Sequence, residues 1–121
     1  MASQDEISRF IQSSFRSVWS LELLLLLKRD PRPWAHSEIL SALRASDLIV
    51  SQSVSALTAA GLLDADAQGN VSYLPVTDHD RLLVEEAEAF YARRPDAVRR
   101  LIVGASSGLA AFADAFRLRK D

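Results

Sequence analysis

The sequence predicts a single domain, over residues 1–121, that is mainly α-helical and contains one small β-hairpin. The length of 121 residues suits one domain with a single modest core. Hydrophobic residues make up 49% of the chain and charged residues 25%, a balance typical of a globular protein. Apolar residues recur at helical spacing along most of the chain, whereas two short runs between residues 62 and 75 are typical of strands.

The composition and the N-terminal residues exclude several classes of protein. There is no cysteine, which excludes disulfides and thiolate metal sites. The opening "MASQDEISRF" is polar and acidic where a secretory signal would be basic and then apolar. The most apolar run, residues 21–28, is far shorter than the roughly 20 residues that cross a bilayer. We therefore expect a cytoplasmic protein without membrane association or cofactor.

The first helical segment covers residues 3–29, which contain neither Gly nor Pro. Ser3 and Glu6 fit a capping box, in which the hydroxyl accepts from a helical N–H and the carboxylate bonds back. The pair Ser13–Ser14 leaves open whether the segment forms one helix or two. The prolines of "DPRP" end it. Its apolar stripe comprises Ile7, Phe10, Ile11, Phe15, Val18, Trp19 and the leucines of residues 21–27.

Two further helices are predicted before the hairpin. One covers residues 36–44, and after a tight turn Ser46 is placed to cap the next. Gly61 ends this third helix because a left-handed residue commonly follows a helix. The expected inward-facing residues are Ile39, Leu40 and Leu43 in the first helix, and Val50, Val54 and Leu57 in the second.

The hairpin and the C-terminal helices complete the chain. "LLDAD" (62–66) and "VSYLP" (71–75) are predicted strands, joined where Gly69 and Asn70 tolerate positive φ. A helix is predicted after the capping pair Thr77 and Asp80, and Pro95 suits the first position of the next helix. A last amphipathic helix carries an apolar stripe that packs either on its own core or on a second copy of the chain. These dimer-interface candidates are Leu109, Phe112 and Phe116.

A helix–turn–helix followed by a hairpin resembles the winged helix-turn-helix fold, here with flanking N- and C-terminal helices. "VSQSVSALTAAGLL" (50–63) is similar to the recognition helix and first wing strand of MarR-like bacterial transcriptional regulators. The matching positions are Val50, Leu57, Gly61, Leu62 and Leu63. The resemblance covers about residues 15–76, roughly half of the chain. It implies a homodimer that binds double-stranded DNA and dimerises through residues 77–121.

The resemblance also implies which side chains meet the bases. Ser51, Gln52 and Ser55 face outward where the family reads base edges. Gln can contact adenine through two hydrogen bonds, and Ser can bond to bases or phosphates. The alternative is that these short polar residues only keep an exposed helix face soluble.

The charge distribution argues against DNA binding. Residues 34–76 contain one basic residue, Arg44, and the four acidic residues Glu38, Asp47, Asp64 and Asp66, so their net charge is −3. Phosphate contacts from Lys and Arg supply nearly all non-specific DNA affinity. The phosphate-contact candidates are Arg29, Arg32 and Arg44. Two functions therefore remain: a DNA-binding transcriptional regulator, or a winged-helix protein-interaction module that no longer binds DNA and docks a basic partner.

No pattern in the sequence predicts a catalytic or metal site. The adjacent residues of "DHD" (78–80) cannot all turn to one ion at the start of a helix. Glu85 and Glu88 are expected on an exposed helix face, paired with Arg81 or Arg93. Because nothing marks a pocket for acid–base chemistry, we expect no enzymatic activity.

Overall fold

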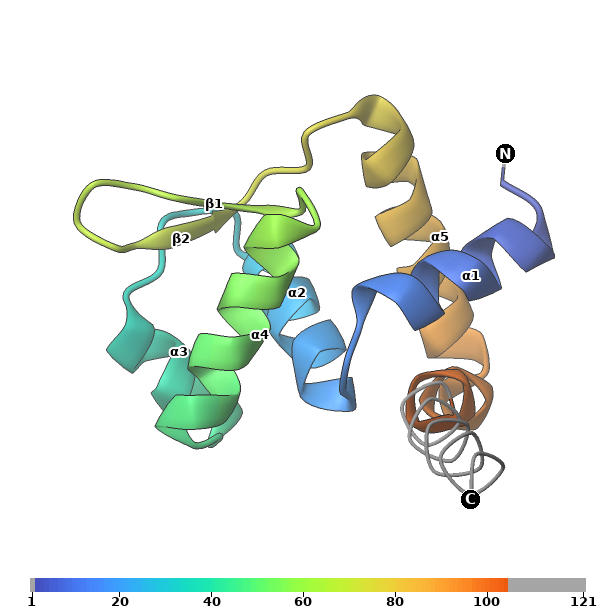
Figure 1. Ribbon diagram of the computed structural model, residues 1–121, viewed down its shortest axis with the longest axis horizontal. Coiled ribbons are helices and arrows are strands. Elements are labelled where there is room, and N and C mark those ends of the chain that lie inside the picture. The colour runs from blue at the N-terminus through green and yellow to red at the C-terminus, as the bar shows by residue number, and fades with distance from the viewer. Residues whose placement is uncertain (1, 105–121) are drawn as a thin grey trace, which may run out of the picture.

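The computed structural model describes residues 2–104 and is mainly helical, with one small two-stranded antiparallel sheet (Figure 1). The elements follow in the predicted order. They are α1 (Gln4–Ser14), α2 (Val18–Arg29), α3 (His36–Leu43), α4 (Asp47–Ala59), β1 (Leu63–Ala65), β2 (Val71–Tyr73) and α5 (Asp78–Arg93), and residues 95–104 are again helical. The predicted fold class, helices with a small hairpin, is therefore confirmed at this level.

The N-terminal apolar segment forms two helices rather than one. α1 ends at Ser14, and the next residue, Phe15, has extended backbone with φ −113° and ψ 111°. Ser17 then caps α2, because its hydroxyl accepts from the backbone N–H of Ser20 at 3.3 Å. The Phe15 side chain is 1% exposed, so a buried ring anchors the link between the two helices.

Only half of the predicted capping box forms at the start of α1. The Ser3 hydroxyl accepts from the backbone N–H of Glu6 at 3.1 Å, as expected. The Glu6 carboxylate does not bond back, and instead lies 2.7 Å from Nε2 of His79. The carboxylate thereby joins α1 to the first turn of α5, against which α1 packs (Figure 1).

The core surrounds α2. Its leucines at 21, 23, 24, 25 and 27 are at most 1% exposed, because α4 packs along this helix and further elements cover its other sides. Residues from both ends of the described chain join the same core: Ile7, Ile11, Val84, Ala87, Val98 and Ile102. Within residues 2–104, no helix combines the length and apolar character needed to cross a bilayer.

The hairpin is shorter than predicted and is held by a third segment. β1 pairs with β2 so that Leu63 lies opposite Tyr73. Trp34, in the link between α2 and α3, adds a bridge to Val71 through two backbone hydrogen bonds of 2.8 and 2.9 Å. This pairing was not predicted. It fixes the hairpin against the helix–turn–helix segment that precedes it.

Asp66 lies beyond β1 and organises the turn. Its Oδ1 accepts from the backbone N–H groups of Gln68 and Asn70, each at 2.9 Å. Gly69 has φ +85°, whereas Asn70, also expected to tolerate positive φ, does not adopt it. The strand predicted over residues 62–66 therefore ends one residue early, so Asp66 belongs to the turn and not to β1.

The tight turn between α3 and α4 depends on an arginine with unusual backbone. Arg44 ends α3 with φ 56° and ψ 36°, and no other non-glycine residue among residues 2–104 has positive φ. Its backbone N–H still donates to the carbonyl of Leu40 at 2.8 Å. Ser46 caps α4 and Gly61, with φ +80°, follows its end, both as predicted.

Candidate functional site

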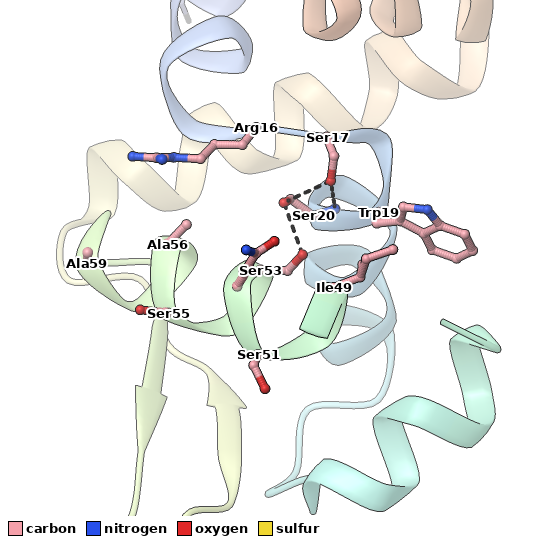
Figure 2. Close-up of a pocket in the computed structure, with 11 residues that line it drawn as sticks. Arg16, Ser17, Trp19, Ser20, Ile49, Ser51, Ser53, Ser55, Ala56 and Ala59 are labelled. Atoms are coloured by element: carbon pink, nitrogen blue, oxygen red, sulfur yellow. Dashed lines mark hydrogen bonds between the residues drawn. The ribbon is translucent and has the colours of Figure 1, made fainter. Parts of the chain in front are cut away.

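An open groove of about 700 Å³ runs beside α4, between this helix and the start of α2 (Figure 2). We call it the α4 groove. Its wall from the α1–α2 link and the start of α2 includes Arg16 and Trp19. The residues that α4 contributes include Ser51, Gln52, Ser55, Ala56 and Ala59.

The structure brings the three base-facing candidates together on the groove. Ser51, Gln52 and Ser55 are all exposed and lie on one side of α4, because residues three and four apart share a helix face. On the opposite side, Val50 and Leu57 are fully buried. Helical spacing predicted the burial of Val50 and Leu57, whereas the outward position of the three polar residues was implied by the resemblance to MarR-like regulators.

A chain of hydroxyl groups fixes α4 against α2 at the base of the groove. Ser20 and Ser53 are 2% and 4% exposed, and the Ser20 hydroxyl donates to Oγ of Ser53 at 3.3 Å (Figure 2). Oγ of Ser17 lies 3.4 Å from Oγ of Ser20. Because these side chains are buried and bonded, the position of α4 relative to the start of α2 is defined by direct contacts.

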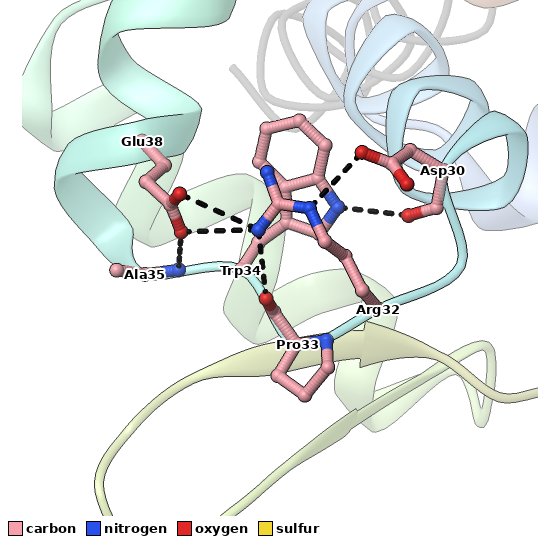
Figure 3. A network of polar contacts seen from close by, with 6 residues as sticks. All are labelled: Asp30, Arg32, Pro33, Trp34, Ala35 and Glu38. Atoms are coloured by element: carbon pink, nitrogen blue, oxygen red, sulfur yellow. Dashed lines mark hydrogen bonds and ion pairs between the residues drawn. The ribbon is translucent and has the colours of Figure 1, made fainter.

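Two of the three residues predicted to contact phosphates, Arg32 and Arg29, lie beside acidic side chains outside the α4 groove. The Arg32 guanidinium stacks on Trp34, 3.9 Å from the ring centroid, and its Nε lies 3.0 Å from Oδ2 of Asp30 (Figure 3). The hydrogen bond with Asp30 raises the pKa of Arg32 above its ordinary value. Nε of Arg29 lies 3.7 Å from a carboxylate oxygen of Glu88. Neither arginine lines the α4 groove.

The third candidate, Arg44, is exposed at the end of α3 and is also absent from the lining of the groove. Asp47 is an exposed acidic residue in the first turn of α4. Its Oδ1 is 2.6 Å from Nε2 of His36, which ties the start of α4 to the start of α3. α4 itself contains Asp47 and no Lys or Arg, so the acidic bias of the sequence is also present on the folded surface.

Glu38 stabilises the start of α3. Its Oε1 accepts from the backbone N–H of Ala35 at 2.8 Å, and it also receives a bond of 3.3 Å from Arg32 (Figure 3). The Ala35 backbone bond first, and Arg32 second, lower the pKa of Glu38. Ala35 has no side-chain oxygen, so only this half of a capping arrangement exists.

The acidic face of α5 is exposed at Glu85, as predicted, but Glu88 is only half-exposed. Oε1 of Glu88 pairs with Nζ of Lys28 on α2 at 2.8 Å, rather than with Arg81 or Arg93. Tyr91 donates to Oε1 of Glu22 at 2.8 Å, a second link between the same helices. These contacts hold α5 to α2 on a side away from the α4 groove lining.

Neither the residues predicted for a dimer interface nor those weighed for a metal site are among the described residues that line the α4 groove. Leu109, Phe112 and Phe116 lie outside the described residues. His79 bonds to Glu6, and within residues 2–104 no cluster of three or more His, Cys, Asp or Glu side chains is placed to hold a metal ion.

Sequence inspection missed Arg16 and Trp19 as groove residues. In the sequence Arg16 is one of several scattered arginines, and Trp19 is one more apolar residue of a helical stripe. Both residues lie at the break between α1 and α2 and line the groove, and Trp19 is 40% exposed. A capping serine directly after Arg16 was the one local signal for that break.

Comparison of the chain with family models, with curated proteins and with solved structures finds no match.

Proposed function

We propose that the chain is a winged helix-turn-helix transcriptional regulator that reads double-stranded DNA with α4. The observation that carries this proposal is the contiguous exposed row of Ser51, Gln52 and Ser55 on the helix that follows the α3–α4 turn. The order α2, α3, α4 and hairpin supports it, as does the Trp34 bridge that seats the hairpin beside these helices.

In this proposal α4 enters the major groove with its polar face toward the base edges. The Gln52 amide is suited to paired hydrogen bonds with adenine, and the Ser51 and Ser55 hydroxyls to bases or phosphates. The hydroxyl chain through Ser20 and Ser53 holds the helix at a fixed angle to the body of the protein. A rigid support of this kind reduces the entropy lost on binding.

The acidic surface sets the expected strength of binding. Asp47 on α4 and Asp64 on β1 are exposed, so both are repelled by nearby phosphates. With few cations to displace counterions, the salt dependence is shallower than that of proteins with six to ten phosphate contacts. A homodimer doubles each contact, and the proposal includes such a dimer.

A second function, a protein-interaction module that binds a basic partner, is favoured by one observation. Trp19 is 40% exposed and lies beside Ile49 at one end of the α4 groove (Figure 2). Exposed aromatic rings are enriched where proteins bind one another. The acidic side chains on α4 and the hairpin are complementary to a basic partner.

Binding to random-sequence duplex DNA at low and physiological salt separates the two functions. A DNA reader binds at low salt and loses affinity linearly in log salt, whereas a protein module shows no DNA affinity even at low salt. On a selected sequence, Gln52→Ala relaxes base preference. Gln12→Ala, an exposed change on α1, is the matched control and leaves preference unchanged. Absence of DNA binding at low salt contradicts the proposal and favours the second function.

A further inference from the structure

We propose that Arg16 is the phosphate-contacting residue of the α4 groove, and that it fixes the register of α4 on the DNA backbone. This inference rests on the proposed function, namely that α4 binds duplex DNA. It replaces the phosphate contacts expected from Arg29 and Arg32, which lie outside the groove.

The position of Arg16 relative to α4 is the first support. Arg16 lines the groove together with the three base-facing residues, and it is exposed. Figure 2 shows its side chain extending past the C-terminal half of α4, near Ala56 and Ala59, whereas Trp19 lies at the other end beside Ile49. A duplex that receives α4 in its major groove brings a phosphate backbone along each side of the helix.

Small side chains of α4 line the groove together with Arg16. Ala56 and Ala59 are small, so the sugar–phosphate backbone can approach α4 closely on that side. The first turn of α2, which begins after Arg16 and Ser17, contains no acidic residue that would repel a phosphate. A guanidinium also matches phosphate oxygens through two parallel hydrogen bonds, a geometry that lysine lacks.

The backbone on both sides of Arg16 is anchored. Phe15 before it is buried, and Ser17 after it caps α2 and contacts Ser20, which in turn bonds to Ser53 of α4. The Cα of Arg16 therefore keeps a defined position relative to the base-facing residues. A contact made from such a position fixes register as well as adding affinity.

The test measures the salt dependence of binding to random-sequence duplex DNA for the full chain and its variants. Arg16→Gln is expected to lower the slope of log K against log salt by about 1 per protomer and to weaken binding equally on all sequences. Arg16→Glu is expected to weaken it further. Arg9→Gln is the control, because Arg9 is exposed on α1 and lies outside the groove. Thermal unfolding of each variant confirms that the fold is retained.

The outcomes separate this inference from the function on which it rests. A wild-type chain that fails to bind DNA at low salt overturns both. A wild-type chain that binds, with an unchanged slope in Arg16→Gln, overturns the assignment of Arg16 and leaves DNA reading by α4 intact. A slope that falls for Arg16→Gln and for Arg9→Gln alike also overturns it, because the effect is then one of net charge alone.

Discussion

The buried hydroxyl pair between α2 and α4 predicts an asymmetric response to mutation. Ser20 has two hydroxyl neighbours, Ser17 and Ser53, whereas the Ser53 side chain bonds only to Ser20 among the described residues. Ser20→Ala leaves the buried Ser53 hydroxyl without a partner, which costs about 1–3 kcal/mol. Ser53→Ala leaves Ser20 bonded to Ser17 and costs only about 0.5–1.5 kcal/mol.

Alanine also favours helix by up to about 0.5 kcal/mol over serine, but both positions are helical and this gain cancels in the comparison. The double variant Ser20→Ala with Ser53→Ala loses no more stability than Ser20→Ala alone, because it leaves no orphaned hydroxyl. Urea unfolding followed by far-ultraviolet circular dichroism gives the four free energies, and the cycle gives the coupling between the two hydroxyls.

Strictly additive losses, or a greater loss for Ser53→Ala than for Ser20→Ala, contradict the reasoning. Strictly additive losses mean that the 3.3 Å contact contributes nothing to the free energy of unfolding. The support of the α4 groove then comes from apolar packing alone.

Three further predictions concern the backbone and the titrating groups. Both Gly61 and Gly69 have positive φ, but a Cβ at Gly61 meets Cγ2 of Val76 at 3.1 Å and one at Gly69 meets nothing within 4 Å. Alanine at either position costs about 1–2 kcal/mol for the backbone, and urea unfolding shows a larger loss for Gly61→Ala. Burial raises the pKa of Tyr73 to about 12, so the folded state favours the neutral phenol. The stability of the fold is therefore unaffected by this group below pH 10 and falls as the pH rises toward 12. Since its hydroxyl is buried without a hydrogen-bond partner within the described chain, Tyr73→Phe leaves stability at pH 7 unchanged or slightly raised and removes this alkaline loss. Because the pKa of Glu38 is lowered in the fold, its carboxylate stabilises the protein at pH values above its ordinary pKa of about 4.5. This stabilisation is lost as the pH falls through the pKa of the folded state. Thermal melts from pH 7 to pH 3 therefore show a smaller acid-induced loss for Glu38→Gln than for the wild type, and an equal loss refutes that role.

The helices were predictable because their signals are local. Ser46 and Thr77 cap helices where the sequence places them, and Gly61 ends α4 with positive φ. The burial of Val50 and Leu57 on α4 also follows from helical periodicity, whereas the burial of Ser53 was not predicted.

The contacts that were missed join residues far apart in the chain. The Trp34–Val71 bridge is a single pair of backbone bonds between the α2–α3 link and β2, and no local pattern marks it. The partner of Lys28 is Glu88, on a helix that follows only after the hairpin. The place of Arg16 depends on where α1 stops, which the serines left open. Predicting these positions requires the packing of whole helices, not their individual propensities.

The burial of α2 has a consequence for synthesis on the ribosome. This leucine-rich helix emerges early, yet α4 packs against it and the core that it belongs to includes residues as late as Val98 and Ile102. At translation rates of roughly 5–20 residues per second, the leucines of nascent α2 stay exposed for seconds before the later core residues are synthesised. A strongly apolar helix exposed for that time is a binding site for chaperones and a risk for aggregation. Truncations that stop before Val98 are accordingly expected to accumulate as insoluble material.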